Sequence, residues 1–488
     1  MQDIDSGVNA YDAVKALAFI GDLSMGQPTD HSVRTAWLAF QLARALDFDA
    51  GGCDTVREAS LLRWSGCTAN AAGFADAFGD DIASREAMLA QRPSWPELLA
   101  RQSDPALAIT PLAQIHCEVS GEVARMLSLS DQTQATLRHI FEAWDGSGFP
   151  EHLLAQSVPH TVFVIALAGD LEVFNRVYGV EQALQLIGQR VDSRYPAAFV
   201  AQANSHAAAW LKELDRTDAA GLDDALATTP LQRATPPELI ADIIDLKLPW
   251  MTGYSREVAA TAAQCCARLT PDPQAANLVY QAGLIHGIGR AAVPNAIWNE
   301  PGQLSASEWE KVRLVPYWTA RAGKQTGTLK QAAELASYAY ERLDETGYFR
   351  SSGAAGMPLE ARILAAAVAA VALRAPRPWR AALSPADAAA LLREQAANGR
   401  FDPQVVDALL ASEGSPPARA CMPQKVRLSA RETDVLRLIS HGASNKDAAK
   451  ELALSPSTVR THVESLFRKL ECSTRAAATL KAASMGLL

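Results

Sequence analysis

The sequence LSARETDVLRLISHGASNKDAAKELALSPSTVRTHVESLFRKLECSTRAAATLKAASMGLL, residues 428–488, decides the fold at the C-terminal end of this chain. Ser429 lies three residues before Glu432, which is the pattern of a capping box at the start of a helix. Ser444 and Ser455 are the capping residues expected for two further helices. Short helices joined by tight turns, the later one with a polar outer face, predict a helix-turn-helix.

The helix that follows Ser455 carries two stripes of side chains along its length. Its apolar stripe, spaced as one face of an α-helix, consists of Val459, Val463, Leu466 and Leu470. Its polar stripe consists of Arg460, Glu464 and Arg468, with Thr461 beside it. The spacing predicts that the apolar stripe packs inward and leaves the polar stripe free to meet a partner. The Ala-rich helix expected over residues 473–485 is either a dimer face or part of the core.

Many residues of this module match one known family. They are Leu428, Ser429, Arg431, Glu432, Val435, Leu436, Gly442, Asn445, Lys446, Ala448, Ala449, Leu452, Ser457, Thr458, Val459, Thr461, His462, Val463, Lys469 and Leu470. On these residues the segment 425–488 closely resembles the LuxR/FixJ-type DNA-binding domain. The resemblance implies a four-helix domain that binds double-stranded DNA, and family members generally do so as homodimers on paired half-sites. A protein-interaction bundle with a solvated charged face is the alternative.

The same resemblance implies which side chains meet DNA. Those implied to face the major groove are Arg460, Thr461 and Glu464. Those implied to lie near phosphates are Lys446, Thr458 and His462, and Arg468 continues the polar stripe. An arginine in the groove can donate to guanine O6 and N7, and a glutamate can accept from cytosine N4.

The charges of the chain are divided unevenly between this module and the rest. The 488 residues carry a net charge of −9, yet residues 425–488 hold eleven Lys and Arg against six Asp and Glu, which is +5. The remainder therefore carries −14. Between the two lies the Pro-punctuated stretch GSPPARACMP, so residues 414–424 are expected to be a linker. A basic module on an acidic body is typical of a polyanion-binding domain.

Length and composition limit the class of protein. At roughly 100–200 residues per domain, 488 residues predict two to four domains, and 49% hydrophobic residues exclude intrinsic disorder. The longest apolar runs, residues 161–169 and 363–373, are shorter than the roughly 20 residues that a membrane span needs. The polar, acidic N-terminus predicts no signal peptide. Seven cysteines without a CxxC motif favour a cytoplasmic location over a disulfide framework.

The acidic body contains an internal repeat. Residues 29–34 parallel residues 252–256, and residues 61–66 parallel residues 284–289, both at an offset of 223. Residues 142–149 parallel residues 341–348 at an offset of 199. Two constant offsets indicate two copies of one domain with a deletion between the matched stretches. The helical spacing of apolar residues in both copies predicts an all-α body. We expect copy one over residues 1–205, an inter-domain segment over 206–237 and copy two over 238–413.

Two motifs in the repeat match a second family. Residues 144–150, WDGSGFP, and residues 289–297, GRAAVPNAI, carry the match. On them the body resembles HD-superfamily phosphohydrolases of the HD-GYP branch. The resemblance implies His and Asp ligands that hold two or three divalent metals, which activate water for attack on a phosphodiester.

The implied metal ligands are largely replaced. Copy one keeps His31, His116 and Asp170 at ligand positions, but its central pair reads Arg63-Trp64. Copy two keeps His286, followed by a glycine where the bridging carboxylate is expected. We therefore expect no binuclear metal centre, no cofactor and no enzymatic activity. A mononuclear metal or polar ligand contact at the three copy-one residues is the alternative to ordinary buried hydrogen bonding.

The former metal sites hold aromatic residues instead, which predicts either an apolar ligand pocket or a filled void. The candidate ligand-binding residues are His31, Trp64, His116, Phe141, Asp170, Tyr254, His286 and Tyr340. The sequence thus predicts a cytoplasmic, homodimeric transcription regulator that binds double-stranded DNA and a small-molecule effector. One alternative is a metal-dependent phosphohydrolase, such as a cyclic-dinucleotide phosphodiesterase with a regulatory DNA-binding tail. Another is a protein-interaction scaffold that senses no ligand.

Overall fold

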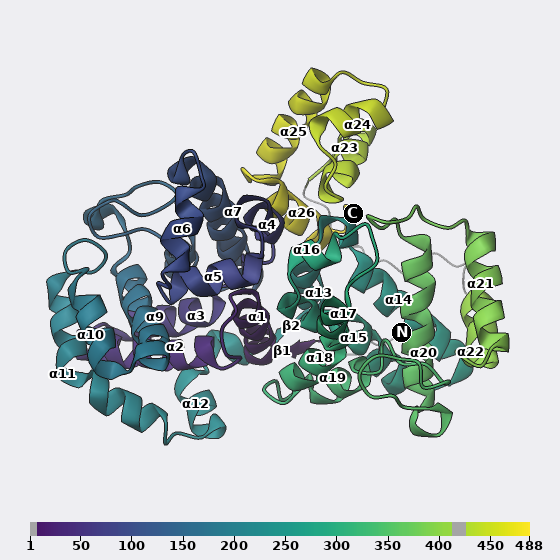
Figure 1. Cartoon of the computed structure of the whole chain (residues 1–488), viewed down its shortest axis with the longest axis horizontal. Helices are drawn as coiled ribbons and strands as arrows, with labels where there is room; N and C mark the ends of the chain where they lie inside the picture. The colour runs from purple at the N-terminus through teal and green to yellow at the C-terminus, as the bar shows by residue number, and fades with distance from the viewer. Residues whose placement is uncertain (1–6, 412–425) are drawn as a thin grey trace. The chain divides into compact units, whose positions relative to one another are not determined.

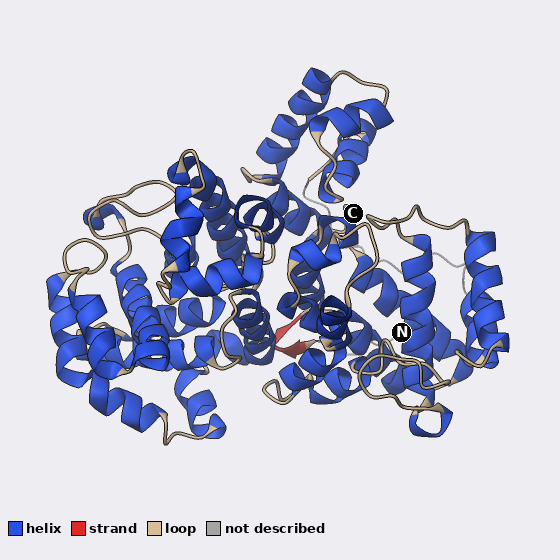
Figure 2. Cartoon of the chain, viewed as in Figure 1, coloured by secondary structure: helices blue, strands red, loops and turns tan. Residues whose placement is uncertain are grey.

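The structure, a computed structural model, describes residues 7–411 and 426–488. Almost every described element is a helix, and the short strands β1 (Val8–Asn9) and β2 (Ala234–Thr235) pair with each other (Figure 2). The predicted all-α class is therefore confirmed. The chain divides into two compact units. The first is Asn9–Thr235, and the second is Pro236–Leu488 together with residues 7 and 8. The linker predicted over residues 414–424 lies outside the described residues. None of the helices in the described ranges is both long and apolar enough to cross a bilayer.

The unit Asn9–Thr235 contains copy one. Its helices are α1 (Ala10–Ser24), α2 (His31–Ala45), α3 (Ala50–Leu62), α4 (Ala71–Phe78), α5 (Asp81–Leu89), α6 (Ser94–Ala100), α7 (Pro105–Met126), α8 (Asp131–Arg138), α9 (His160–Tyr178), α10 (Val180–Gly188), α11 (Ala197–Leu214) and α12 (Ala219–Leu226). Helices α3 and α9 pack against α2, and so do α11 and α12. This unit therefore continues past residue 205, where the sequence predicts that copy one ends, because α11 runs across that position.

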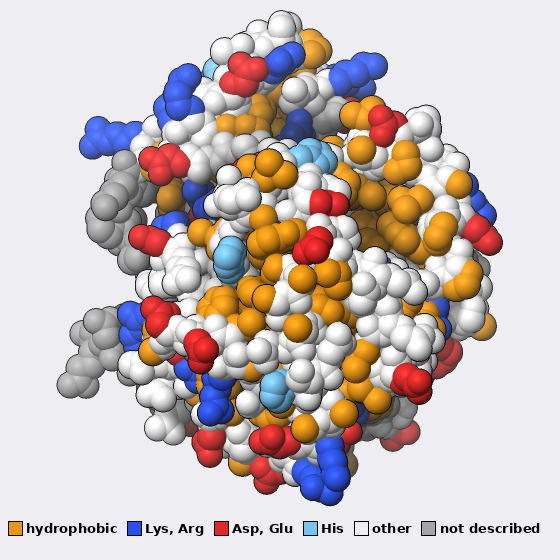
Figure 3. Space-filling model, turned by 90° about the vertical axis from the view of Figure 1, so that its left-hand side faces the viewer, with side chains coloured by type: hydrophobic (Ala, Val, Ile, Leu, Met, Phe, Trp, Pro, Cys, Tyr) orange, Lys and Arg blue, Asp and Glu red, His pale blue; other side chains and the backbone are white. Residues whose placement is uncertain are grey.

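Large apolar side chains also lie on the surface of this unit. Leu107 is 74% exposed, Leu154 60% and Tyr178 38%. Figure 3 shows apolar side chains gathered in groups on one face of the molecule, with acidic and basic side chains scattered among them.

Copy two lies in the second unit. Its helices are α13 (Glu238–Asp245), α14 (Tyr254–Leu269), α15 (Pro273–Ile285), α16 (Asn295–Trp298), α17 (Ala306–Arg313), α18 (Val315–Gly323), α19 (Lys330–Ala336), α20 (Leu359–Arg374), α21 (Pro385–Ala397) and α22 (Pro403–Ala411). Helix α14 packs against α15 and α20, and α15 packs against α19 (Figure 1). Helices α2 and α14 begin 223 residues apart, and so do α3 and α15, whereas α9 and α20 begin 199 apart. The helix boundaries thus keep both offsets of the sequence repeat.

The C-terminal module consists of four helices, drawn in yellow shades in Figure 1. They are α23 (Ala430–Ser440), α24 (Asn445–Glu451), α25 (Pro456–Leu470) and α26 (Arg475–Ser484). Ser429 and Ser444 each form a complete capping box, and Ser455 caps α25 by accepting from the Thr458 amide. The four apolar residues predicted along α25 are buried in the core of the module. The alanines of α26 at positions 478 and 482 belong to the same core.

Glu432 joins the helices of this module through buried polar contacts. Its carboxylate accepts hydrogen bonds from Lys469 Nζ at 2.7 Å, from Ser465 Oγ at 2.9 Å and from the Ser429 amide at 2.7 Å. Burial opposes the charged form, but the hydrogen bond from Lys469 and those from the serines outweigh it and lower the pKa of Glu432 to about 2. The ionised carboxylate therefore stabilises the contact of α23 with α25.

Glu432→Gln should destabilise the module by about 1.5–3 kcal/mol at neutral pH, because it removes charge-assisted hydrogen bonds. Amide hydrogen exchange in α23 and α25 of the full chain measures this, with the exposed Glu451→Gln as the control. The lowered pKa of Glu432 makes its contribution complete above its unfolded pKa of about 4.3 and removes it as pH falls toward about 2. A difference between variant and wild type that stays constant down to this pH would contradict the assignment.

Candidate functional site

The polar face of α25 lies at the surface of the C-terminal module. Five of the residues implied to meet DNA are exposed on this helix, namely Thr458, Arg460, Thr461, Glu464 and Arg468. His462 is half-buried, and Lys446 is exposed on α24. The Ser455 cap and the buried apolar stripe position this face, since they fix where α25 begins and which side turns inward. The structure therefore brings all seven predicted residues to α24 and α25.

Arg460 and Glu464 form an ion pair across one turn of α25. Arg460 Nε donates to Glu464 Oε1 at 2.9 Å, and the two side chains are 75% and 60% exposed. An exposed pair at this spacing contributes only about 0.3–0.5 kcal/mol. Either side chain can therefore exchange this contact for a base edge at little cost.

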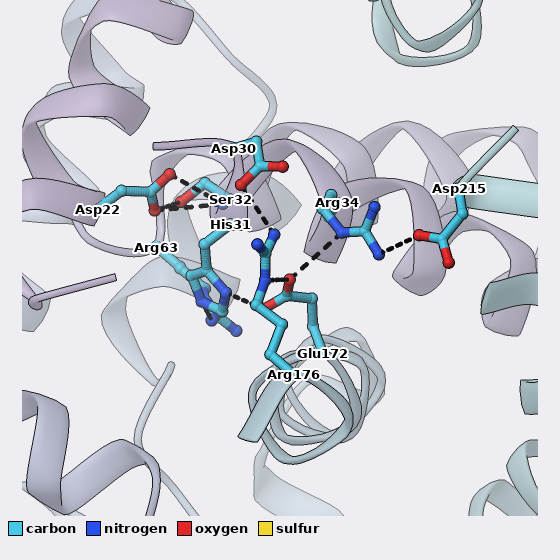
Figure 4. A network of polar contacts seen from close by, with 9 residues as sticks. All are labelled: Asp22, Asp30, His31, Ser32, Arg34, Arg63, Glu172, Arg176 and Asp215. Atoms are coloured by element: carbon cyan, nitrogen blue, oxygen red, sulfur yellow. Dashed lines mark hydrogen bonds and ion pairs between the residues drawn. The ribbon is translucent and has the colours of Figure 1, made fainter. Parts of the chain in front are cut away.

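The predicted copy-one residue His31 belongs to a buried network of charged side chains (Figure 4). Its Nδ1 contacts Glu172 of α9, and its Nε2 contacts a guanidinium nitrogen of Arg63, which follows α3. A neutral imidazole satisfies both contacts, with Nδ1–H donating to Glu172 and Nε2 accepting from Arg63. Burial lowers the pKa of His31, although Glu172 opposes the shift. Arg176 also contacts Glu172, and burial of this carboxyl is outweighed by His31 and Arg176, so its pKa falls to about 2.

His116 and Asp170 lie in separate contacts. His116 on α7 donates from Nε2 to the carbonyl oxygen of Arg63 at 2.7 Å, and burial lowers its pKa to about 3. Its ring packs against Phe141 at 4.6 Å and Trp64 at 6.0 Å between centroids. Asp170 accepts from the hydroxyl of Tyr195 and from Arg190. Trp64, Phe141 and His116 therefore form one aromatic cluster, which does not include His31 or Asp170.

Copy two brings its three predicted residues together around a buried arginine. Arg290 of the 3-10 helix η4 (Ile288–Ala292) donates to His286 Nε2 at 2.7 Å and to Asp245 Oδ1 at 3.1 Å. His286 in turn donates from Nδ1 to the Gly283 carbonyl at 2.6 Å. The rings of Tyr254 and Tyr340 lie 5.7 and 6.1 Å from the His286 ring.

A cavity of about 260 Å³ opens beside these residues in copy two. Its lining combines small aliphatic side chains with aromatic and charged ones, among them Trp250, Tyr254, Arg290, Trp298, Tyr340, Glu341, Tyr348, Arg377 and Trp379. Of the candidate ligand-binding residues that the sequence predicts, Tyr254 and Tyr340 belong to this lining, and Val315, Ala339 and Val368, at other ligand positions of the HD-GYP pattern, belong to it as well. The aromatic and basic stretch PRPWR, residues 376–380, was the available signal for Arg377 and Trp379.

His31 and His286 stand at positions where the HD-GYP resemblance implies metal ligands, so their hydrogen-bond partners show what occupies those positions. In both copies an arginine occupies the Nε2 side of a histidine. Within the residues that the structure describes, no group of three or more His, Cys, Asp or Glu side chains has the arrangement of a metal site. His31, His116 and Asp170 each make their own polar contacts, with Glu172, with the Arg63 carbonyl and with Tyr195 respectively.

Comparison with known proteins extends the description of the body. A 3'3'-cGAMP-specific phosphodiesterase of Vibrio cholerae is 27% identical over 422 residues, which are 80% of this chain and 91% of that protein. The crystal structure of a cyclic GMP-AMP specific phosphodiesterase of Vibrio cholerae superimposes with a TM-score of 0.61. It is 23% identical and covers 84% of this chain and 99% of that one. At this identity the likeness shows a shared fold.

The C-terminal module has relatives of a different kind. A transcriptional regulatory protein, NarL, of Mycobacterium tuberculosis is 51% identical over 61 residues, which are 12% of this chain and 28% of that protein. Residues 426–482 match the family of bacterial regulatory proteins named luxR, and residues 238–405 match the HD domain family.

The phosphodiesterase relatives contradict the expectation that the chain is not an enzyme. Four fifths of the chain align with a protein named as a phosphodiesterase, and a solved phosphodiesterase shares the fold. The expectation was wrong because it judged activity from residue identity at single motif positions. Replacement of residues at the motif positions does not by itself exclude activity.

Arg63→Leu should destabilise copy one by about 3–5 kcal/mol, because it leaves a buried charge network without one of its cations. Amide hydrogen exchange should accelerate in α2, α3 and α9 while α14, α15 and α20 keep their wild-type rates. Arg290→Leu is the matched variant and should produce the reverse pattern. Equal acceleration of both sets by either variant would show that these arginines do not organise separate copies.

The boundary between the two family matches coincides with the boundary between the acidic body and the basic four-helix module. The acidic, helical body contains the HD match, and the basic four-helix module contains the luxR match. Residues 238–405 are therefore an HD domain, and residues 426–482 are a C-terminal helix-turn-helix domain of the luxR family of bacterial regulatory proteins.

Proposed function

We propose that this protein is a cytoplasmic, homodimeric transcription regulator whose HD-type body binds a small-molecule effector. The observation that carries the proposal is the exposed polar face of α25 on a luxR-type module joined to the HD body. The module supplies the DNA-binding function of the regulator. The body binds the effector, and this binding shifts the population of the protein between two conformations that differ in their affinity for DNA.

The DNA-binding surface consists of the seven residues on α24 and α25. Arg460, Thr461 and Glu464 contact base edges in the major groove, where the arginine donates to a guanine. Lys446, Thr458 and His462 contact phosphates, and Arg468 extends the same face. Their exposure and the net charge of +5 on residues 425–488 support this assignment.

A homodimer fits this surface because one module makes few phosphate contacts, and two modules on paired half-sites double them. The exposed apolar side chains of copy one, such as Leu107 at 74% and Leu154 at 60%, support association through the body.

The effector that we propose is a cyclic dinucleotide. The relatives named above are specific for cyclic GMP-AMP by their printed names, and one of them aligns with 80% of this chain. A ligand shifts the DNA affinity of a regulator only by the difference in its affinity for the two arrangements. The effect on operator binding is therefore the quantity to measure.

Phosphodiesterase activity is the second candidate function, and the names of the same relatives favour it. In that case the body hydrolyses a cyclic dinucleotide, and the C-terminal module is a regulatory DNA-binding domain of this enzyme.

Arg460→Ala should weaken binding to the preferred DNA sequence by about 1–3 kcal/mol, because it removes a base contact. Lys446→Ala should weaken binding about equally on all sequences and reduce the salt slope by about 1, because it removes a phosphate contact. Fluorescence anisotropy with DNA selected from a random pool measures both, and the exposed Arg268→Ala in the body is the control. If both variants bind DNA with the affinity of the wild type, the assignment of the DNA-binding surface to α24 and α25 is wrong.

Purified protein incubated with cyclic GMP-AMP should show a change in DNA affinity with the nucleotide intact. Chromatography of the nucleotide, with Mn²⁺ or Fe²⁺ present and after treatment with a chelator, distinguishes the two candidates. Chelator-sensitive cleavage supports the phosphodiesterase. A DNA affinity indifferent to every cyclic dinucleotide, without cleavage, contradicts both roles of the body and leaves the DNA-binding module standing.

A further inference from the structure

Three side chains with metal-binding donor atoms meet in the core of copy one. Met25 directly follows α1, Cys67 lies in the turn after α3, and His116 lies on α7. The Cys67 thiol donates to Met25 Sδ at 3.2 Å, and its Sγ lies 3.6 Å from His116 Nδ1. Each of the three residues is at most 2% exposed. Two sulfur atoms and an imidazole nitrogen therefore converge away from solvent.

His116 turns a lone pair toward the thiol. Its Nε2 donates to the carbonyl oxygen of Arg63 at 2.7 Å, so Nε2 carries the ring proton. Burial favours the neutral ring, and Nδ1 of a neutral ring then carries a lone pair that points at Cys67. A hydrogen bond from the remote ring nitrogen to a backbone carbonyl also holds metal-binding histidines in their orientation. The single proton of the Cys67 thiol thus faces two acceptors, Nδ1 and Met25 Sδ.

The backbone around these donors is held by buried contacts. Arg85 of α5 donates from Nη1 to the carbonyl oxygen of Ser24 at 3.2 Å and from Nη2 to that of Cys67 at 3.0 Å. It thereby ties the end of α1 to the turn that carries Cys67. A Cβ atom at Gly66 would stand 2.3 Å from the carbonyl oxygen of His116, so glycine is needed where this turn lies against α7. The positions of the three donors are therefore fixed by the fold.

This set of donors belongs to copy one alone. At the offsets of the repeat, 223 and 199 residues, the corresponding positions of copy two hold Leu248, Arg290 and Val315. None of these three side chains supplies a lone pair to a metal. Met25 and Cys67 also lie outside the positions at which the HD-GYP resemblance implies metal ligands. The cluster is therefore distinct from the metal centre of that family.

We propose that Met25, Cys67 and His116 form a binding site for a soft monovalent cation, copper(I). Thiolate and thioether sulfur select copper(I), and imidazole is a further ligand that suits copper. On binding, the S–H bond of Cys67 breaks, the proton goes to water, and a sulfur–copper bond takes its place. The Met25 thioether and the Nδ1 lone pair of His116 complete a three-coordinate centre.

The charge of the cluster favours a monovalent ion. The Cys67 thiolate supplies one negative charge, which one monovalent cation cancels. A divalent ion would leave one positive charge in a core where Arg63 and Arg85 already hold buried guanidinium groups. Such an uncompensated buried charge costs several kcal/mol, on the order of the effective desolvation penalty of an ion in a protein.

Bond lengths and access also fit a small ion. With bonds of about 2.3 Å to sulfur and about 2.0 Å to nitrogen, the donors of a trigonal centre lie roughly 3.7–4.0 Å apart. The distance from Cys67 to His116 is close to this range, and the flexible, unbranched side chain of Met25 can move back by the remainder. Met88 and Leu89 of α5, both half-buried, pack against the cluster that contains Met25 and Cys67, so the site lies just beneath the surface.

Copper(I) offered to the full chain as its bicinchoninate complex, without oxygen, tests the site. The wild type should withdraw one equivalent more tightly than any further equivalents, and Cys67→Ser should abolish this tight binding. Met25→Leu, which keeps the size of the side chain, should weaken it by at least about tenfold, because a soft ligand is lost. Cys53→Ser is the matched control, since this buried thiol donates to the Phe48 carbonyl at 3.6 Å, and it should bind as wild type does.

X-ray absorption at the copper edge of the loaded wild type gives a second measurement that needs no variant. It should show two sulfur ligands and one nitrogen ligand, and an excess of Zn²⁺ should leave the copper in place. Copper(I) affinity that is unchanged in Cys67→Ser, or a spectrum that lacks either kind of ligand, would overturn the site. Displacement of the copper by Zn²⁺ would overturn the assignment of a monovalent ion.

Discussion

Each copy of the repeat depends on a buried arginine that contacts the Nε2 atom of a histidine. Arg63 meets His31 in copy one, and Arg290 meets His286 in copy two. A guanidinium removed from water costs several kcal/mol unless carboxylates and acceptors surround it. That requirement draws together helices that are far apart in the sequence, as the 141 residues between His31 and Glu172 illustrate. The guanidinium of Arg63 is thus the buried positive charge beside His31 in copy one, and the guanidinium of Arg290 is the buried positive charge beside His286 in copy two.

A buried aspartate also needs hydrogen-bond partners, and both copies meet this need in the same way at the start of α2 and of α14. Asp22 accepts from Ser32 Oγ at 2.6 Å, and Asp245 accepts from Ser255 Oγ at 2.7 Å, in positions 223 residues apart. Burial raises the pKa of Asp245 to about 6, although Arg290 opposes the shift. The copies differ in what surrounds the arginine. In copy one Trp64 packs with His116 and Phe141, whereas in copy two the aromatic side chains line a cavity beside unsatisfied polar atoms.

The C-terminal module shows how far local sequence rules reach. Ser429, Ser444 and Ser455 cap the helices that the sequence predicts, and the apolar stripe of α25 is buried as its spacing indicates. The candidate sites of the body were less accessible to such reasoning. The family positions identified His286 and Tyr254, but they did not identify Arg290 or Arg377 as their charged partners. They also led to the mistaken expectation that enzymatic activity is absent, because a motif position carries no information about the groups that surround it in space.

The sequence by itself determined the all-α class, the repeat and the helix-turn-helix, because caps and apolar periodicity act over three to eleven residues along one helix. The composition of the buried sites was decided only by the tertiary structure. It separates His31, His116 and Asp170 into different contacts, although all three stand at positions of one family motif. It also brings Arg377 to Tyr254, which lies 123 residues earlier in the chain. Such contacts depend on how whole helices pack, since the cost of burying each charge is settled only when its partners are in place.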